Sequence, residues 1–286
     1  MLKTEPPYIS SCPIGCRSDL VVSDIVLPEG PLRRCSVCGQ LVLRIDETIY
    51  KNSMKVFDDP KGTCQSGIIS RRLLKRTKKT LKTAKVLLGK DYHDIRLLDV
   101  GCSIGSFITI ANNLGVYAEG VEPMPKPAMT AVKSGLKVHQ GFLEDLPLPE
   151  QSFDIVTLIE VIEHLQDPVS LLQACHRVIR PDGLMIIRTG NTDSWTVRFM
   201  KDRWDYFCPA IGHISFFNTD SMRILADRTK FTIEKIRFHS VSFSRKEDVP
   251  VIQYRVAKFF SELLNFPSKL FGKSHEIEVF LRAKNI

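Results

Sequence analysis

The stretch that most constrains the fold is residues 97–105, which read LLDVGCSIG: an apolar run, an acid and a loop of small residues. This order is typical of a buried strand, a tight turn and a helix N-terminus, where backbone amides can approach a polar or anionic ligand. Ser103 stands where a dinucleotide-binding loop has its second glycine, so the close approach that a pyrophosphate needs is missing. A nucleotide-type cofactor without phosphates, with an ammonium group near Asp99, would explain both features.

The same stretch resembles motif I of the class I S-adenosylmethionine-dependent methyltransferases, and four further segments match that family in order and spacing. These segments are residues 120–122 (GVE), 141–147 (GFLEDLP), 153–164 (FDIVTLIEVIEH) and 180–183 (RPDG). The resemblance covers about residues 70–286 and is strongest over 97–190. It implies an α/β Rossmann-like methyltransferase domain, which we expect over residues 91–286.

Strand and helix patterns alternate along this region, as in a doubly wound parallel sheet. We predict strands at 97–100, 116–121, 136–139, 154–159 and 184–189, and helices at 104–114, 126–134 and 167–179. Helix 219–229 and strands 231–239 and 275–284 would complete a mostly parallel seven-stranded sheet with the family's antiparallel hairpin. Residues 190–218 and 241–273 are predicted insertions that select the substrate.

The resemblance also implies roles in S-adenosylmethionine binding. Gly101, Cys102 and Gly105 would offer backbone to the methionine part, and Asp99 would hold its ammonium directly or through water. Glu122 would bind the ribose hydroxyls. Phe142 replaces an aspartate that is common in the family and is expected to stack on adenine. The other expected cofactor contacts are Pro123, Met124, Leu143, Ile159 and Glu160.

Four of the eight cysteines form two closely spaced pairs, Cys12 with Cys16 and Cys35 with Cys38. Paired turns of this kind provide four thiolates for tetrahedral zinc, and strand patterns at 20–26 and 40–45 complete a zinc-ribbon pattern over residues 1–46. Disulfides are the alternative, disfavoured by a cytoplasmic location. So small a segment would draw much of its folding energy from the structural metal. We expect Cys64, Cys102, Cys175 and Cys208 to be packed or incidental thiols.

Charge and hydropathy limit the location and the partners. The N-terminus has no apolar signal-peptide core and no apolar run could cross a bilayer, so we expect a cytoplasmic protein. The net charge is +8, and residues 1–90 hold 17 Lys and Arg against 8 Asp and Glu. Residues 47–90 are interpreted as a linker followed by a basic helix at 71–88. That helix is either a solvated outer face or an anion-binding wall.

Transfer of a methyl group to a hydroxyl needs a base to remove the proton. His213 is the preferred candidate, because its insertion also holds Trp195 and Trp204, which could stack on a sugar or aromatic ring. His164 and Asp193 are the alternatives, with a structural role for His164 equally open. Asp205 and Tyr206, which lie nearby in the sequence, are further alternatives for the base.

The acceptor class is the least constrained property. The chain resembles bacterial methyltransferases that act on small molecules and sugars, so we predict a hydroxyl of a surface polysaccharide, a glycolipid or a quinone-type molecule. An RNA or other nucleic-acid methyltransferase is the first alternative, disfavoured because the ribbon lacks a dense basic or aromatic surface. A non-catalytic cofactor-binding scaffold is the second. An amphipathic helix at 251–266 would pack as a lid or contact a membrane. The oligomeric state stays open.

Overall fold

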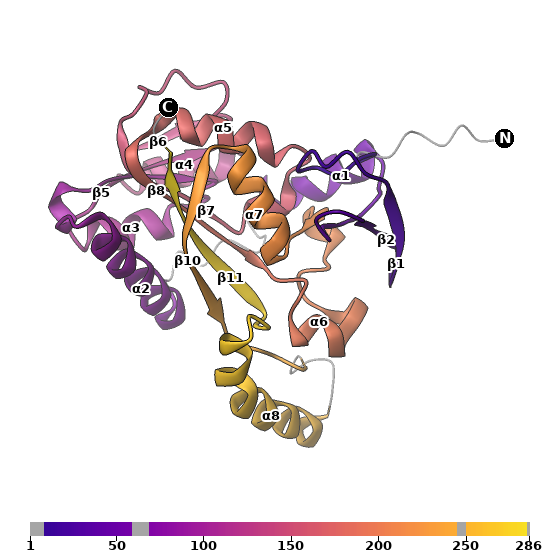
Figure 1. Ribbon diagram of the computed structural model, residues 1–286. Coiled ribbons are helices and arrows are strands. Elements are labelled where there is room, and N and C mark those ends of the chain that lie inside the picture. Colours follow the sequence, from indigo (N-terminus) through magenta and orange to yellow (C-terminus); the bar gives the residue numbers. More distant parts are fainter. Residues whose placement is uncertain (1–8, 59–68, 245–249, 285–286) are drawn as a thin grey trace.

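The computed structural model describes residues 9–58, 69–244 and 250–284, and its centre is a seven-stranded sheet in the order β10-β11-β8-β7-β4-β5-β6 (Figure 1). Neighbouring strands from β8 to β6 are parallel, whereas β11 is antiparallel to both β8 and β10. The predicted fold class is therefore confirmed. The strands are β4 (Arg96–Val100), β5 (Tyr117–Glu122), β6 (Val138–Gln140), β7 (Phe153–Ile159), β8 (Ile179–Gly190), β10 (Phe231–His239) and β11 (Glu276–Ala283).

Helices cover both faces of this sheet. Alternate residues of β4 point to opposite faces, so Leu97 packs with one core cluster and Leu98 with the other. The first cluster includes side chains of α2 and α3, and the second includes those of α5 and α7. The helices of this domain are α2 (Arg71–Leu88), α3 (Ser106–Asn112), α4 (Pro125–Lys133), α5 (Pro168–Val178) and α7 (Thr219–Arg228), and the 3-10 turns are η2 (Tyr92–Asp94) and η3 (Ile162–His164).

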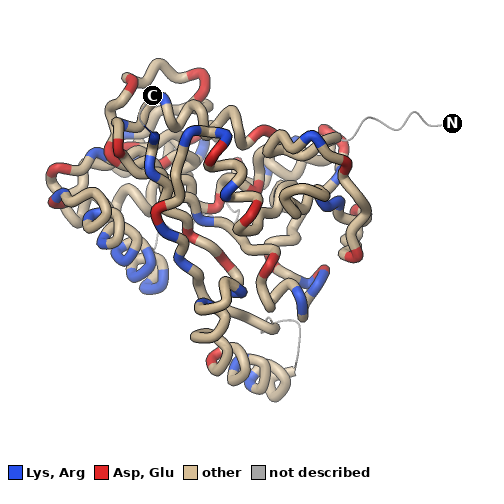
Figure 2. The backbone as a smooth tube through the Cα atoms, viewed as in Figure 1, with Lys and Arg blue, Asp and Glu red and all other residues tan. Residues whose placement is uncertain are grey.

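The predicted basic helix is α2, and its bounds match the expectation. Ser70 caps its start by accepting a hydrogen bond from the Leu73 amide, and Gly89 ends it in the left-handed conformation. Leu81 and Ala84 bury its apolar stripe, while its lysines and arginines line the outer side (Figure 2).

The N-terminal strands form a second sheet in the order β1-β2-β3-β9. β1 (Leu20–Leu27), β2 (Gly30–Cys35) and β3 (Leu41–Val42) come from the ribbon, whereas β9 (Ser215–Phe216) comes from the first insertion. Their side chains share one core with Trp204, Phe207 and Phe216. The ribbon is therefore packed onto the insertion.

Three segments differ from the predicted elements. Residues 47–58, expected to be linker, form α1 (Glu47–Met54) and the 3-10 turn η1 (Lys55–Asp58), because the Asp46 carboxylate caps the Ile49 amide. β8 starts at Ile179 and includes the expected turn 180–183, since residue 179 already pairs with Phe153. The expected helix 251–266 is α8 (Val251–Leu270), four residues longer. The first insertion also holds α6 (Trp195–Met200), η4 (Lys201–Arg203) and η5 (Pro209–Ile211).

Among the described residues, we find no helix that combines the length and the apolar character needed to cross a bilayer.

Candidate active site and metal centre

The loop after β4 has a fixed backbone with little room for side chains. Gly101 and Gly105 have φ values of 73° and 80°, which favour glycine. A Cβ on Gly101 would lie 2.5 Å from the Val161 side chain, and one on Gly105 would lie 2.2 Å from Leu136. A side chain at position 105 would therefore collide with Leu136, and the expected backbone contact of Gly105 with the cofactor stays a prediction.

Glu122, at the carboxyl end of β5, ties two loops together. Its Oε2 accepts a hydrogen bond from the Ser103 amide (2.8 Å) and its Oε1 accepts one from the Met124 amide (2.9 Å). Burial raises the pKa of this carboxyl. The loops after β4 and β5 are thereby held side by side at one edge of the sheet, the place where ligands of open α/β sheets bind.

Asp99 lies below this loop, inside β4. Only 3% of the residue is exposed, and its Oδ1 accepts a hydrogen bond from Thr157 Oγ1 (2.5 Å). Burial raises its pKa to about 7. So little exposed surface favours an indirect contact with a ligand ammonium over a direct one.

The other expected cofactor residues divide by exposure. The Phe142 side chain is 62% exposed and available for stacking, whereas Leu143 and Cys102 are buried, so that only their backbone could reach a ligand. Pro123 and Met124 are partly exposed.

β7 ends at Ile159, and Glu160 follows it with a φ of 57°. The residue as a whole keeps exposed surface, whereas its carboxylate is surrounded by protein atoms and accepts a hydrogen bond from the buried Tyr206 hydroxyl. Desolvation of the carboxyl, followed by the charge of Glu276, raises the pKa of Glu160 to about 7. Tyr206, one of the alternative bases, is thereby joined to Glu160 at the end of β7.

The two candidate histidines lie together, with ring centroids 4.7 Å apart. His213 Nδ1 lies 2.7 Å from the Tyr206 carbonyl oxygen, and His164 Nδ1 lies 3.2 Å from that of Gly212. A carbonyl only accepts, so each Nδ1 carries the proton and each neutral ring keeps Nε2 as its acceptor. Burial lowers the pKa of both rings, that of His164 to about 3. Both histidines are therefore neutral near pH 7.

Glu163 joins this pair. One donor atom from each of Glu163, His164 and His213 lies within 4.8 Å of the others, a set that could hold a divalent cation. Glu163 also accepts a hydrogen bond from Thr189 Oγ1 (3.2 Å). Among the described residues, no hydrogen bond joins Asp193 to this group. The Asp193 amide donates to Asn191 Oδ1 instead.

One expectation about the tryptophans is wrong. Trp204 is fully buried and donates a hydrogen bond from Nε1 to His275 Nδ1 (3.1 Å), so it cannot stack on a substrate. Trp195 packs near Phe271, with ring centroids 6.4 Å apart. Both side chains therefore stabilise the insertion.

The segment formed by α1 and η1 covers this histidine pair, which the sequence analysis did not anticipate. The Tyr50 hydroxyl donates to the His164 carbonyl oxygen (2.7 Å), and the Phe57 ring lies edge-on to His164 at 5.3 Å. Asp58 accepts a hydrogen bond from the Lys126 amide at the start of α4 (3.3 Å). The aromatic character of Tyr50 and Phe57 was the feature of the sequence that could have indicated this contact. Their partner, His164, lies more than 100 positions away.

The four N-terminal cysteines converge as the zinc-ribbon pattern predicts. Their sulfur atoms lie within 4.8 Å of one another, and none of these thiols is in a disulfide. Cys12 Sγ and Cys38 Sγ are 3.6 Å apart, close to the spacing of about 3.8 Å that tetrahedral zinc with 2.3 Å bonds requires. The cluster therefore fits a zinc ribbon. Cys102 and Cys175 are also free and buried, Cys208 is partly buried, and Cys64 lies outside the described residues.

Helix α7 holds both cysteine turns. Asn218, its N-cap, donates from Nδ2 to the Cys38 carbonyl oxygen (3.1 Å), and Arg228 donates to that of Ile14 (2.6 Å). The cysteine cluster belongs to the same core as Phe217 and Met222. The predicted domain boundary at residue 46 stays a prediction, but the two cysteine turns and the main domain share one packed core.

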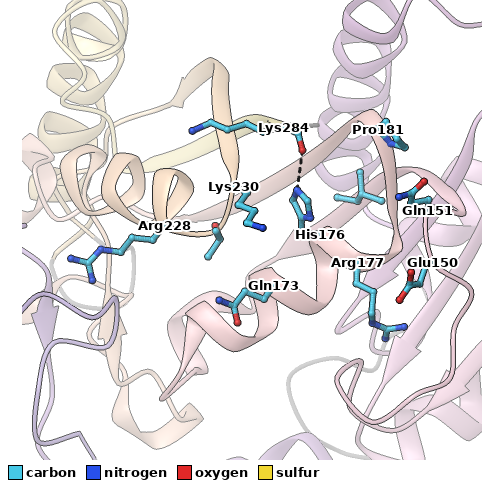
Figure 3. Close-up of a pocket in the computed structure, with 11 residues that line it drawn as sticks. Glu150, Gln151, Gln173, His176, Arg177, Pro181, Arg228, Lys230 and Lys284 are labelled. Carbon is cyan, nitrogen blue, oxygen red and sulfur yellow. Dashed lines mark hydrogen bonds between the residues drawn. The ribbon is translucent and has the colours of Figure 1, made fainter. Parts of the chain in front are cut away.

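A separate hollow of about 530 Å³ lies away from these motifs (Figure 3). It is lined by residues at the start of β8 and by Arg228, Lys230 and Lys284. The sequence motifs meet at the carboxyl ends of the parallel strands, whereas Ile179 and Pro181 begin β8. This hollow is therefore not the cofactor site.

Comparisons with known proteins agree with this geometry. A family model described as "Methyltransferase domain" matches residues 69–236. "Ubiquinone biosynthesis O-methyltransferase" from Haemophilus ducreyi is 34% identical over 107 residues, covering 34% of this chain and 45% of that protein. The protein of the same name from Cereibacter sphaeroides is 34% identical over 121 residues, covering 40% and 49%. The chain thus spans about half the length of the curated relatives it matches.

Solved structures support the fold alone. A SAM-dependent methyltransferase from Archaeoglobus fulgidus superposes with a TM-score of 0.53 at 19% identity, covering 74% of this chain and 94% of that chain. The [4+2]-cyclase SpnF superposes with a TM-score of 0.55 at 15% identity, covering 85% and 98%. The family model matches more than half of this chain. The chain therefore belongs to the class I S-adenosylmethionine-dependent methyltransferases.

Proposed function

We propose that this protein transfers the methyl group of S-adenosylmethionine to a hydroxyl of a quinone-type small molecule. The observation that carries the proposal is the neutral His164–His213 pair, locked by carbonyl oxygens at the carboxyl end of β7. A hydroxyl acceptor needs a base in the correct tautomer, and each ring keeps Nε2 for that purpose. The names of the curated relatives support a quinone-type acceptor over a glycan.

In this proposal the cofactor lies against residues 101–105, with its ribose at Glu122 and its adenine beside Phe142. The amides that Glu122 now binds hold its carboxylate in place, so the cofactor would meet a preorganised acceptor. S-adenosylmethionine supplies the methyl group on a sulfonium, and transfer is an in-line displacement. The protein then has to align the acceptor and take its proton, and His213 is the proposed base.

The acceptor ring would be enclosed by residues that lie far apart in the sequence. Phe57 lies against His164 on one side, and Tyr206 contacts His213 on the other, with ring centroids 5.7 Å apart. Phenolic rings are suited to such aromatic surroundings. We further propose that Cys12, Cys16, Cys35 and Cys38 bind one structural zinc, with no part in methyl transfer.

The test combines binding and turnover. Calorimetry with S-adenosylmethionine measures the cofactor site, and methyl-labelled cofactor is then offered with phenolic quinone-type acceptors, a sugar panel and RNA. We expect label in the phenolic set. His213→Gln should lower turnover by about 10²- to 10⁴-fold with unchanged cofactor affinity. His93→Gln, on an exposed ring in η2, is the matched control.

Two results would change the proposal. Cofactor binding without labelled product in any set would favour a binding scaffold, consistent with a fold that also supports a cyclase. Label in sugars or RNA would keep the enzyme class and replace the acceptor.

A further inference from the structure

Helix α8 (Val251–Leu270) carries its apolar face outward. Only Ser268 of its 20 residues is buried. The residues partly covered by the rest of the protein include Tyr254, Ala257, Ser261 and Asn265. Tyr254, Ser261 and Asn265 line a hollow of about 230 Å³. Surface helices of globular proteins normally bury their apolar stripe instead. The exposed large apolar residues of α8 are Val251, Ile252, Val256, Phe259, Phe260, Leu263, Phe266 and Leu270.

This apolar surface continues beyond the helix. Phe271 directly follows α8 and is exposed, and Phe199 of α6 is exposed beside Phe243, with ring centroids 5.2 Å apart. In Figure 1, α8 projects from the sheet at the end where α6 lies. Exposed apolar residues gathered in this way mark a contact with another molecule or with a membrane.

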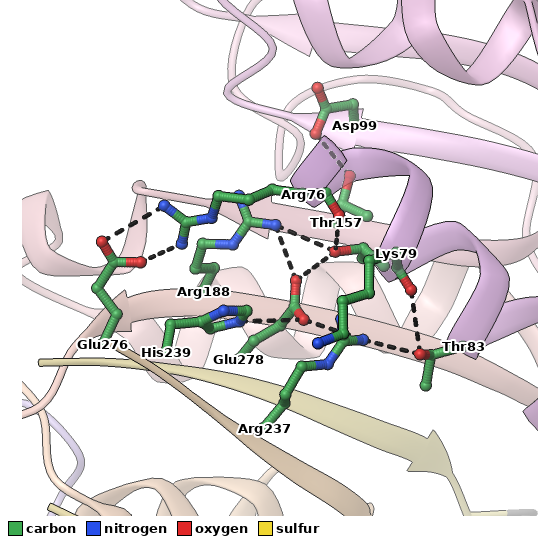
Figure 4. A network of polar contacts seen from close by, with 11 residues as sticks. Arg76, Lys79, Thr83, Asp99, Thr157, Arg188, Arg237, His239, Glu276 and Glu278 are labelled. Carbon is green, nitrogen blue, oxygen red and sulfur yellow. Dashed lines mark hydrogen bonds and ion pairs between the residues drawn. The ribbon is translucent and has the colours of Figure 1, made fainter. Parts of the chain in front are cut away.

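A basic groove adjoins the C-terminal end of α8. This hollow, of about 810 Å³, lies between α2, β10 and Lys269, and no acidic residue is among those that line it. Its cationic lining residues are Arg72, Lys75, Arg76, Lys79, Arg237 and Lys269. Glu276 binds the Arg76 guanidinium and Glu278 binds that of Arg237 beneath the groove (Figure 4). Arg72, Lys75 and Lys269 remain exposed at its rim.

We propose that α8 and this groove form one docking surface for an anionic phospholipid membrane. The apolar face would enter the boundary of the acyl chains with the helix, about 30 Å long, parallel to the membrane. The groove would hold headgroup phosphates. A second copy of the chain could also cover the apolar face. In such a dimer, however, the cationic grooves of the two copies would lie together and repel each other, in a chain whose net charge is already +8. Charge complementarity therefore favours the lipid.

The test is co-sedimentation of the full chain with phosphatidylcholine vesicles, with and without phosphatidylglycerol. We expect binding to the anionic vesicles and release as salt rises from about 0.1 M to 1 M, which shortens the Debye length from about 10 Å to about 3 Å. The Phe259→Glu, Phe266→Glu double variant should bind at least about tenfold more weakly, because two charges replace exposed apolar anchors. Lys75→Glu with Lys269→Glu should abolish the preference for phosphatidylglycerol.

Val22→Glu with Val26→Glu is the matched control, because both valines are 59% exposed in β1, compared with 62% for Phe259, and the pair adds the same two negative charges as the double phenylalanine variant. It should bind membranes more strongly than the double phenylalanine variant. Circular dichroism checks that each variant is folded. Absence of binding to anionic vesicles at low salt would overturn the proposal, as would equal losses in the control and the double variant. A dimer that the double variant dissociates, without vesicle binding, would assign the face to a second copy. The assay measures no methyl transfer, so its result is independent of the proposed function.

Discussion

Replacing Glu278 with glutamine should lower the free energy of unfolding by about 3–5 kcal/mol at pH 7, the usual cost of breaking a buried ion pair. The Glu278 side chain is fully buried in β11, and its carboxylate binds Arg188 (2.8 Å) and Arg237 (3.2 Å) and accepts from Thr80 Oγ1 (2.5 Å) (Figure 4). Glutamine keeps the shape of the side chain but leaves these cations without their anion. At about 2.1 cal/mol/K per residue over 286 residues, the melting temperature should fall by about 5–8 °C.

The pH dependence separates charge from packing. His239, Arg188 and Arg237 hold the pKa of Glu278 well below its usual range, against the opposing effect of burial. A carboxyl with a depressed pKa stabilises the fold above its unfolded value, near 4.3, and this stability is lost as the pH falls through the folded value. The difference between wild type and Glu278→Gln should therefore shrink in acid.

Urea unfolding, followed by tryptophan fluorescence at pH 7 and near pH 3.5, measures both effects. Fully buried Trp204 contributes to the signal. Glu234→Gln is the control, because Glu234 binds Arg282 at 2.9 Å in a partly exposed pair, for which about 1 kcal/mol or less is expected. The reasoning fails if Glu278→Gln costs no more than the control, or if its cost is the same at both pH values.

Four further outcomes are expected. Glu122→Ala should weaken S-adenosylmethionine binding by about 1–3 kcal/mol in calorimetry, and unchanged affinity would limit Glu122 to joining the two loops. Cys38→Ser should remove zinc in elemental analysis and lower the melting temperature, because the cysteine cluster packs against α7, whereas retained metal would contradict the ligand set. If His213 is the base, the acid limb of the turnover profile should lie below pH 6.5, because burial lowers its pKa, and a limb at or above 6.5 would implicate another group. Phe57→Ala should raise the KM of the acceptor about 2- to 10-fold with little change in kcat, whereas an unchanged KM would remove Phe57 from the acceptor site.

Local signals explain what could be predicted from the sequence. Residues 97–105 needed only an apolar run and glycines, and the structure shows a strand, a loop with two glycines at positive φ, and a helix. The predicted bounds of helix α2 match the structure, where Ser70 and Gly89, both next to its ends in the sequence, cap it. The cysteine cluster was predictable because zinc ligands occur in short, recognisable pairs.

Long-range packing explains what could not be predicted. Nothing near Tyr50 in the sequence indicates its bond to the carbonyl oxygen of His164, which lies 114 positions away. The periodicity of α8 identified an apolar face but could not show which face the protein covers. Trp204 was assigned to substrate stacking because an aromatic residue in an insertion has the same appearance whether it is buried or exposed.

The pairing of β3 with β9 has a consequence for the synthesis of the chain. Leu41 and Val42 pair with residues 216 and 215, which a ribosome adds about 170 residues later, roughly 10–35 s at ordinary rates. During that time the β3 edge of the nascent ribbon is unpaired, the kind of surface on which strands of other chains can add. All four cysteines are made before this interval begins. Early capture of a metal ion would hold the first hairpin in its final shape until its last strand arrives.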